Sequence, residues 1–202
     1  MKDLVAQLRI SLTATLFLAV ILCGVYPLTV WVLGQGLFSD KANGSLVKGN
    51  GKILGSRLIA QGFTSPQYFH PRPSAAGQGY DAISSGGRNL GPLSRKLVET
   101  VRQRVDEYRK ENDLPLDAPV PADAVTASAS GLDPHISLKN ALIQAPRVAR
   151  ARGWSEDVVL QQIKVNAEGR DLGILGEPRV NVLMLNFALD GTPTGIKSMG
   201  ND

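Results

Sequence analysis

The sequence has a single cysteine, Cys23, and only two histidines, His70 and His135. One cysteine cannot form an intramolecular disulfide. No cysteine and histidine lie at the spacing of a metal site, which needs several such ligands close together. We therefore expect neither a disulfide framework nor a bound metal ion, and the cysteine count leaves the redox compartment open.

The sequence also lacks the motifs of two common enzyme classes. It contains no G-x-S-x-G turn, which carries the nucleophile of many hydrolases, and no G-x-x-x-x-G-K-[ST] loop, which cradles nucleotide phosphates. The net charge is +4, but the 22 basic residues are scattered singly or in short pairs. Because nucleic-acid binding usually needs a basic patch, we expect no nucleic-acid partner.

One long uncharged stretch lies near the N-terminus. Residues 10–33 (ISLTATLFLAVILCGVYPLTVWVL) carry no charged side chain, and about 20 apolar residues suffice to cross the hydrocarbon core. A cleaved secretory signal has a shorter apolar region, of about 7–15 residues, before a small-residue cleavage site. We therefore expect a retained transmembrane helix over 10–34, preceded by a short segment, 1–9. Gly24 and Pro27 could kink this helix and indicate packing against other helices.

The charges that flank this stretch predict its orientation. Lys2 and Arg9 precede it, whereas the first basic residue after Leu33 is Lys41. Because cytoplasmic flanks carry the excess of Lys and Arg, the N-terminus is expected in the cytoplasm. Residues 35–202 are then expected outside. The sequence therefore predicts a single-pass protein of a bacterial inner membrane with a periplasmic domain.

Residues 35–202 are expected to form one α+β domain. Gly-Asn-Gly at 49–51 predicts a hairpin that leads into a strand over Ile53–Ile59. Apolar residues at helical spacing predict a helix over 93–112, and the proline-rich segment after it is expected to be extended. The apolar stripe of this helix consists of Leu93, Leu97, Val101, Val105 and Tyr108.

A long segment between the predicted strand and helix is dense in glycine, proline and serine. It also contains three aromatic side chains, those of Tyr68, Phe69 and Tyr80. A flexible linker would normally lack such rings, because they bury large apolar areas. We therefore expect an ordered loop that is held in place by these three rings.

Two further helices are predicted in the C-terminal third. Ser137 and Ser155 are suitable N-cap residues, and each predicted helix ends at a glycine. Pro146 lies inside the first of them. Because a proline and the residue before it disfavour a continuous helix, we expect this helix to be broken into two short ones.

The last regular element is predicted as a buried strand. Residues 179–191 (RVNVLMLNFALDG) are apolar at both alternating positions, as in a strand covered on both faces. Asn181 and Asn186 interrupt this pattern. If they are buried, their amides need hydrogen-bond partners, and we expect them to hold neighbouring loops.

The segment SASGLDPHIS, residues 128–137, contains a pair of side chains that could act in catalysis. Asp133 and His135 lie only two residues apart, so a nucleophile and a third group would have to come from elsewhere. The structural alternative is that Asp133 caps a turn or helix start, with Pro134 at the first position, and that His135 is structural. We favour this alternative, and a membrane-anchored periplasmic hydrolase is the competing function.

Three other polar features have ordinary structural explanations. The segment SSGGRNLGP, residues 84–92, could offer backbone N–H groups to an anion ahead of a helix, but a tight turn explains it better. His70 fits a surface or packing role. Arg147, Arg150 and Arg152 could face an acidic partner, although a solvated helix end is the simpler interpretation.

Taken together, these motifs resemble those of the KdpC family, a subunit of the bacterial Kdp potassium-pumping P-type ATPase. The resemblance covers nearly the whole length of the chain. It includes the N-terminal span and, in order, GSRLIAQGFTSPQYFHPRPSA, SSGGRNLGP, VTASASGLDPHIS, QAPRVARARG and LGILGEPRVNVLMLNFALD. The chain departs from the family pattern at Arg88, where a small polar residue is expected.

The resemblance implies a subunit without catalytic residues or a cofactor of its own. The implied partners are a channel-like potassium-translocating subunit, a P-type ATPase subunit that binds the ATP, a small membrane peptide and membrane lipid. It also implies a catalytic-chaperone role that raises the ATPase subunit's affinity for nucleotide, with a glutamine that matches Gln144. By itself, Gln144 indicates only a cap or contact residue.

The predicted topology separates Gln144 from cytoplasmic ATP by the hydrocarbon core of about 30 Å. Direct contact with nucleotide is therefore not expected. An indirect effect is possible, because a domain docked on the outer face can shift the conformational equilibrium of the pump.

Overall fold

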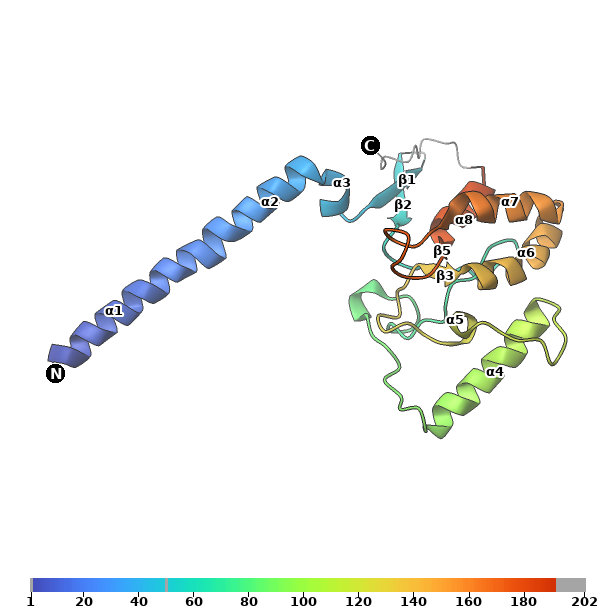
Figure 1. Cartoon of the computed structure of the whole chain (residues 1–202), viewed down its shortest axis with the longest axis horizontal. Helices are drawn as coiled ribbons and strands as arrows, with labels where there is room; N and C mark the ends of the chain where they lie inside the picture. Colours follow the sequence, from blue (N-terminus) through green and yellow to red (C-terminus); the bar gives the residue numbers. More distant parts are fainter. Residues whose placement is uncertain (1, 50, 192–202) are drawn as a thin grey trace. The chain divides into compact units, whose positions relative to one another are not determined.

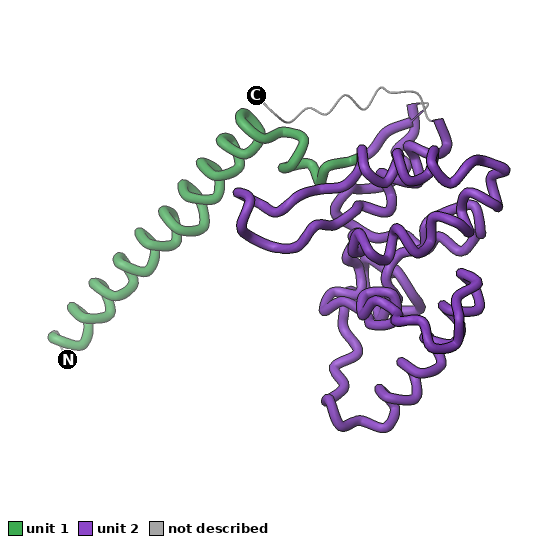
Figure 2. Tube along the Cα trace, turned by 45° about the vertical axis from the view of Figure 1, so that its right-hand side comes forward, with its two compact units in different colours: residues 1–46 green, residues 47–202 purple. Residues whose placement is uncertain are grey.

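The computed structural model describes residues 2–49 and 51–191 of the chain. It divides into two compact units, residues 1–46 and residues 47–202 (Figure 2). The first unit contains the long apolar stretch. The second contains the helices from residue 82 onward and a three-stranded sheet.

Unit 1 is dominated by one helical run, drawn in blue in Figure 1. The run comprises α1 (Lys2–Ala19), the π-helical turn η1 (Val20–Val25) and α2 (Tyr26–Leu37), and the short α3 (Ser39–Ala42) follows. The stretch Asp3–Leu37 has a mean hydropathy of 2.4 in its most apolar window, none of which is buried within the chain. It is long and apolar enough to cross a membrane, which agrees with the predicted span.

The π-helical turn lies directly before the proline of this run. The backbone N–H of Tyr26 donates to the carbonyl of Ile21, five residues earlier, and Pro27 follows in the first turn of α2. A proline removes one amide donor and crowds the carbonyl four residues before it. A widened turn relieves that crowding, so the helix continues through Gly24 and Pro27.

Unit 2 packs three helices on a small antiparallel sheet (Figure 1). The helices are α6 (Leu138–Arg152), α7 (Glu156–Asn166) and α8 (Val182–Leu189). The strands, in sheet order, are β3 (His135–Ser137), β5 (Arg179–Asn181) and β4 (Ala167–Glu168). Val180 lies opposite Ile136 on one side and Ala167 on the other. This combination of helices and sheet is compatible with the predicted α+β class.

The predicted hairpin is confirmed at the start of unit 2. Strands β1 (Leu46–Gly49) and β2 (Lys52–Ser56) form a two-stranded sheet. The second strand ends at Ser56 rather than at Ile59. The chain turns there, because the Ile59 N–H donates to the Ser56 carbonyl and the next amide, that of Ala60, donates to Leu132.

The glycine- and proline-rich loop is ordered, as predicted, and its only regular element is the 3₁₀ turn η2 (Ala82–Ser84). Phe69 is fully buried in the core of unit 2. The Tyr80 hydroxyl donates to the Arg72 carbonyl at 2.8 Å, and the Tyr68 ring lies 5.3 Å from that of Phe63. All three predicted aromatic residues therefore hold the loop.

Helix α4 (Arg95–Glu111) begins after Ser94, whose hydroxyl accepts from the Leu97 N–H. The predicted stripe packs from Leu97 onward and ends at the buried Tyr108. Leu93 is a correction to that stripe: it precedes the helix and is 95% exposed. The proline-rich segment that follows is not wholly extended, because it contains the single-turn helix α5 (Ala122–Val125).

The break predicted at Pro146 is wrong, because α6 continues through that residue. The physical reason is burial. Ala141, Ala145, Val148 and Ala149 form a buried stripe on both sides of the proline. A proline inside a helix costs about 3 kcal/mol, and burying one Val-sized side chain already contributes about 1.5–3 kcal/mol. The packing of the whole stripe therefore outweighs the lost hydrogen bond.

The predicted helix caps are confirmed in part. The Ser137 hydroxyl accepts from the Asn140 N–H at 3.1 Å, and α6 ends at Gly153, which has the left-handed conformation that glycine favours. Ser155 precedes α7 but makes no side-chain cap. Helix α7 ends at Asn166 rather than at a glycine, because the next two residues join the sheet as β4.

The long strand predicted over residues 179–191 is also wrong. Only Arg179–Asn181 is a strand, and α8 follows at once. The Asn181 side chain accepts from the Met184 N–H and so caps the helix. A continuous apolar run fits a fully buried helix as well as a buried strand, and periodicity alone cannot separate the two.

Both asparagines of this segment hold loops, as predicted. The Asn181 amide donates to the Arg57 carbonyl at 2.8 Å. The fully buried Asn186 accepts from the Phe69 N–H at 2.8 Å and donates to the Phe69 carbonyl at 3.0 Å. The long loop is therefore held by hydrogen bonds between its backbone and the Asn186 side chain of α8, as well as by its rings.

Candidate functional site

Gln144 lies at the centre of a buried polar cluster between α6 and the long loop. Its side chain is 1% exposed. The amide oxygen accepts from the His70 N–H at 2.7 Å and from Arg147 Nη2 at 2.8 Å. The amide nitrogen donates to the His70 carbonyl at 3.1 Å and to Asn140 Oδ1 at 2.9 Å. An amide has two donors and two acceptor positions, so Gln144 is fully satisfied within the chain.

The cluster continues through Asn140 toward α4 and α5. The buried Tyr108 hydroxyl donates to Asn140 Oδ1 at 2.8 Å, and the Asn140 amide donates to Asp123 at 3.0 Å. Asp123 also accepts from the Ser137 N–H and hydroxyl, at 2.7 and 2.9 Å. Burial, and then the charge of Asp123, raise the pKa of Tyr108 well above its usual range.

Arg147 closes the other side of the cluster and is 7% exposed. It donates to the carbonyls of Pro66 and Tyr68 at 2.6 and 3.1 Å, and to Asn112 Oδ1 at 3.1 Å. The nearest carboxylate is that of Glu111, at 3.9 Å. Burial lowers the pKa of Arg147. Its charge is therefore held mainly by carbonyl and amide oxygens of the chain.

The solvated arginine face predicted at the end of α6 needs correction. Arg147 faces inward, and Arg152 donates to the Leu189 carbonyl and to Asp190 while its guanidinium lies over the ring of Tyr68. Only Arg150 is well exposed, in an ion pair with an exposed aspartate. Helical spacing alone could not separate these three, because the loop that covers the helix comes from far away in the sequence.

His70 has a packing role in this structure. Its Nδ1 lies 2.6 Å from Glu111 Oε1, and its Nε2 lies 3.1 Å from the Ser65 carbonyl. The hydrogen bond from His70 holds the pKa of Glu111 below its usual range, against the effect of burial. His70 thereby joins the long loop to the C-terminal end of α4.

Asp133 and His135 form a second, more exposed cluster with Arg72. Asp133 accepts from Arg72 Nη1 at 2.9 Å and from the His135 N–H at 3.0 Å, and His135 Nδ1 lies 3.4 Å from the same carboxylate. The other ring nitrogen, Nε2, lies 3.7 Å from Glu168. Burial raises the pKa of Asp133, but the hydrogen bonds from His135 and Arg72 outweigh it and bring the pKa to about 2.

These contacts favour a structural function for the second cluster. The two ring nitrogens of His135 each have a carboxylate within 4 Å, that of Asp133 at 3.4 Å and that of Glu168 at 3.7 Å. A hydrolase of the serine type needs a nucleophile at one of these nitrogens. Asp133 caps the turn as predicted, but Pro134 does not start a helix, because β3 begins at His135 and α6 only at Leu138.

The glycine loops beside this cluster pack closely against one another. A side-chain carbon at Gly131 would lie 2.7 Å from the Ala76 nitrogen and from the Gly86 oxygen. The Gly86 N–H and the Ser85 hydroxyl both donate to the Ser130 carbonyl, at 2.9 and 3.0 Å. This backbone approach explains the glycines and supports the tight-turn interpretation of residues 84–92.

Sequence reasoning missed two residues that organise these clusters, Asp123 and Arg72. Asp123 lies in a proline-rich segment that packs against the start of α6, and no local sequence pattern predicts this packing. Arg72 is part of the YFHPRP motif, but its partner Asp133 is distant in sequence. Among the residues that the structure describes, no group of three or more His, Cys, Asp or Glu is placed to hold a metal ion.

The sequence over residues 8–191 matches the family described as "KdpC: K+-transporting ATPase, c chain". The chain belongs to the KdpC family. The match includes the apolar helix of unit 1 and both polar clusters of unit 2. Gln144 and the Asp133–His135 pair therefore lie within the residues that the family model matches.

Individual KdpC proteins agree with this assignment. The Mycobacterium tuberculosis relative is 55% identical over 184 residues, which is 91% of this chain and 97% of the relative. The Koribacter versatilis relative is 50% identical over 191 residues, 95% of each chain. The Nitratidesulfovibrio vulgaris relative is 53% identical over 194 residues, 96% of this chain and 98% of the relative. Each is named "Potassium-transporting ATPase KdpC subunit".

Proposed function

We propose that the chain is a non-catalytic accessory subunit of an ATP-driven potassium import complex, in which it stabilises the assembly of the other subunits. The observation that carries this proposal is the KdpC match, which spans residues 8–191 and includes the apolar helix as well as the folded unit. The proposed partners are a channel-like potassium-translocating subunit, a P-type ATPase subunit and a small membrane peptide. The ATP is bound by the ATPase subunit.

The apolar helix anchors the subunit in the inner membrane in this proposal. Its side chains find no cover within the chain, and a hydrocarbon environment would bury them. Lys2 and Arg9 lie on one flank, and basic residues are sparse on the other until Lys41. This asymmetry supports a cytoplasmic N-terminus and a periplasmic unit 2.

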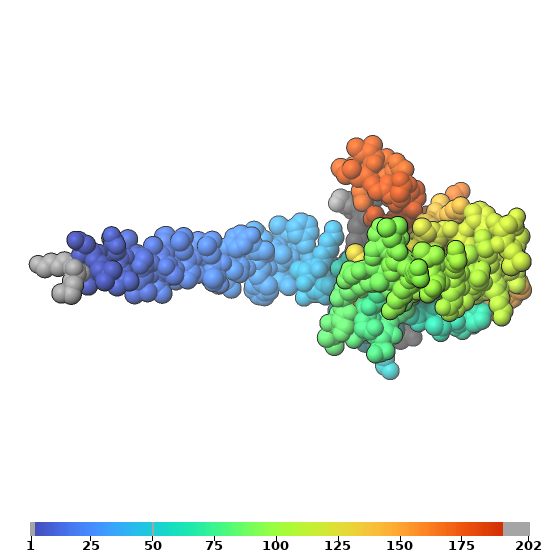
Figure 3. Space-filling model, turned by 90° about the horizontal axis from the view of Figure 1, so that it is seen from below, coloured from blue at the N-terminus to red at the C-terminus, as the bar shows by residue number. Residues whose placement is uncertain are grey.

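A projecting hairpin of unit 2 supports an assembly role. Residues 168–178 are all exposed, and Figure 3 shows this segment in orange, standing out from the rest of unit 2. Its tip presents Leu172, Ile174 and Leu175, which are 56–88% exposed. Arg179 braces the base through Glu168 at 2.9 Å. An exposed apolar group on a braced hairpin is typical of a protein contact.

Gln144 acts indirectly in this proposal. Because all four of its hydrogen-bond positions are taken within the chain, it has none to offer a nucleotide. We propose that its cluster fixes the shape of unit 2, and that this shape biases the conformational equilibrium of the pump and so its nucleotide affinity.

The contact between Asp133 and His135 leaves a periplasmic hydrolase as the second candidate function. This alternative predicts that the chain hydrolyses ester substrates and that His135→Ala loses this activity.

Assembly is tested by copurification from membranes. The double variant Leu172→Asp with Ile174→Asp is expected to lose most of the other Kdp subunits, because two charges would replace the apolar tip. Leu116→Asp is the matched control, since Leu116 is also exposed, at 87%, but lies outside the hairpin. If the wild-type chain copurifies with no Kdp subunit, the proposed function is wrong. If the double variant retains all of them, the hairpin is not the contact.

The indirect role of Gln144 is tested by the KM for ATP of the assembled complex. Gln144→Ala and Asn140→Ala are expected to raise this KM together, because Asn140 holds the Gln144 amide and belongs to the same cluster. Gln161→Ala, at an exposed position of α7, is expected to leave it unchanged. An increase in Gln144→Ala alone would favour direct contact with nucleotide.

A further inference from the structure

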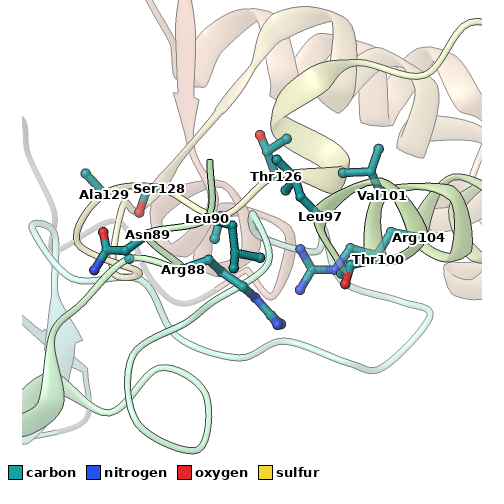
Figure 4. A pocket seen from close by; sticks show the side chains of 12 residues that line it. Arg88, Asn89, Leu90, Leu97, Thr100, Val101, Arg104, Thr126, Ser128 and Ala129 are labelled. Atoms are coloured by element: carbon teal, nitrogen blue, oxygen red, sulfur yellow. The ribbon is translucent and has the colours of Figure 1, made fainter. Parts of the chain in front are cut away.

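A separate pocket of about 230 Å³ lies beside α4 (Figure 4). Its walls come from α4, from the segment after Gly86 and from the segment that leads into SASGLDPHIS. It shares no lining residue with the Gln144 cluster or with the Arg72–Asp133–His135 cluster. Nothing in the proposed function uses it.

Two arginines from different elements meet in this pocket. Figure 4 shows Arg88, from the loop, and Arg104, from α4, with their guanidinium groups turned toward the same space. Burial lowers the pKa of Arg104, and the charge of Arg88 lowers it further. The two cations are therefore close enough to repel each other, which is unfavourable unless an anion lies between them.

Neither arginine has an ion-pair partner within the part of the chain that the structure describes. Arg104 donates to the Val125 carbonyl at 3.0 Å, and the charge of Glu107 acts on it in the opposite direction to that of Arg88. Glu107 itself accepts from Gln103 at 2.7 Å. Neither arginine forms an ion pair with a described carboxylate, and no described side chain or backbone group accepts a hydrogen bond from Arg88.

The chemistry of the pocket selects a small oxyanion. A guanidinium presents parallel N–H donors that match the oxygens of phosphate and carboxylate. Two guanidiniums best neutralise a group that carries about two negative charges at pH 7, as a phosphate does. The volume lies below the roughly 300–1,000 Å³ of pockets for drug-sized ligands, so a whole nucleotide is too large. We propose that this pocket binds a phosphate group between Arg88 and Arg104.

Two sources could supply this group, free inorganic phosphate and the headgroup of an anionic phospholipid. Binding to either removes the repulsion between the two arginines. A ligand that binds only the folded chain also raises its stability in proportion to the logarithm of its concentration. Phosphate is therefore expected to raise the unfolding temperature of the chain, and the effect is expected to weaken at high salt.

The first experiment is calorimetric titration of the full-length chain, in a neutral detergent, with inorganic phosphate. Arg88→Ala is expected to weaken binding at least about tenfold, because it removes charge-assisted hydrogen bonds. Arg88→Lys is expected to retain part of it. Arg102→Ala is the matched control, since Arg102 lies on α4 at an exposed position outside the pocket. Arg104→Gln is a second test of the pocket, but it can fail to fold because Arg104 donates to the Val125 carbonyl. Arg88 makes no hydrogen bond or ion pair with any described residue, so Arg88→Ala tests the site in either case.

The second experiment separates the two sources. The chain is placed in nanodiscs of phosphatidylcholine, with or without phosphatidic acid, and titrated again with phosphate. Competition by phosphatidic acid that disappears in Arg88→Ala supports the headgroup, and phosphate binding without competition supports the free anion. Either result supports the pocket. Phosphate binding by Arg88→Ala that equals that of the wild type would overturn the proposal. Wild-type chain that binds neither probe would also overturn it. If Arg88→Ala then also loses Kdp subunits in copurification, an acidic side chain of a protein partner is favoured as the group that meets the two arginines.

Discussion

Arg147 and Arg88 are the same residue type in opposite situations. Arg147 is almost completely buried, and its donors are used by oxygens of two distant segments and of Gln144 in its own helix. Arg88 is exposed at the rim of a pocket and faces a second cation, Arg104. The comparison teaches that the number of internal partners, and not the charge, separates an arginine that holds the fold from one that is available to a ligand.

Arg72 lies between these extremes. Its side chain is 24% exposed, and among the described residues its ion-pair partner is Asp133 alone. One of its buried nitrogens, Nε, has no hydrogen-bond partner among the described residues. The three arginines therefore form a series, and substitutions along this series are expected to have decreasing effects on stability.

The largest effect is expected for Arg147→Ala. It leaves the carbonyls of Pro66 and Tyr68 without this donor and removes one of the two donors to the Gln144 oxygen. Each buried acceptor that loses its partner costs about 1–3 kcal/mol, so a total loss of about 3–5 kcal/mol is expected. Thermal unfolding of the full-length chain in detergent measures this loss. Arg150→Ala, at an exposed ion pair of the same helix, is expected to cost no more than about 1 kcal/mol. Equal losses in the two variants would remove the distinction between inward and outward arginines.

A smaller loss, of about 2–3 kcal/mol, is expected for Gln144→Ala. The substitution leaves a partly buried N–H and carbonyl of His70 unpaired. Each such group costs about 1–3 kcal/mol, which solvent entry partly offsets. Gln144→Glu is expected to be at least as damaging, because a carboxylate can accept from the His70 N–H but cannot donate to its carbonyl. Chemical denaturation, with Gln161→Ala as the control, checks the order. A Gln144→Ala chain as stable as wild type would show that the cluster does not hold the loop.

The Arg72–Asp133 pair is expected to make stability depend on pH in a narrow acidic window. The pKa of Asp133 is lowered from 3.8 to about 2 in the folded chain. Its contribution is therefore fully present above about pH 4 and is lost as the pH falls through about 2. Because the pair is partly exposed, the contribution is at most about 1 kcal/mol. Unfolding temperatures between pH 2 and 5 are expected to fall more steeply for wild type than for Asp133→Asn, and parallel curves would exclude this source.

The difference between local patterns and contacts across the fold explains which features the sequence could predict and which it could not. The apolar span, the hairpin, α4 and the loop-holding roles of Asn181 and Asn186 follow from local patterns, because period, turn residues and capping act over a few positions. Pro146 and residues 179–191 were mispredicted because burial in the core decided their structure.

The candidate site was less predictable than the fold. Asp133 was singled out from its local sequence and Gln144 only through the family resemblance. Their partners were not predicted, since Gln144 binds His70 and Asp133 binds Arg72 across the long loop. No local pattern encodes such contacts. The inward orientation of Arg147 depends on the same loop, so it became visible only in the folded chain.

The smallest effect is expected for Arg88→Ala in the absence of ligand. Surface substitutions away from internal contacts change stability by no more than about 0.5 kcal/mol, and here the change removes a cation that repels Arg104. The unfolding temperature should therefore stay the same or rise slightly in phosphate-free buffer, whereas added phosphate should stabilise only the wild type. A marked loss of stability without phosphate would show that Arg88 holds the fold as Arg147 does, and would place it at the other end of the series.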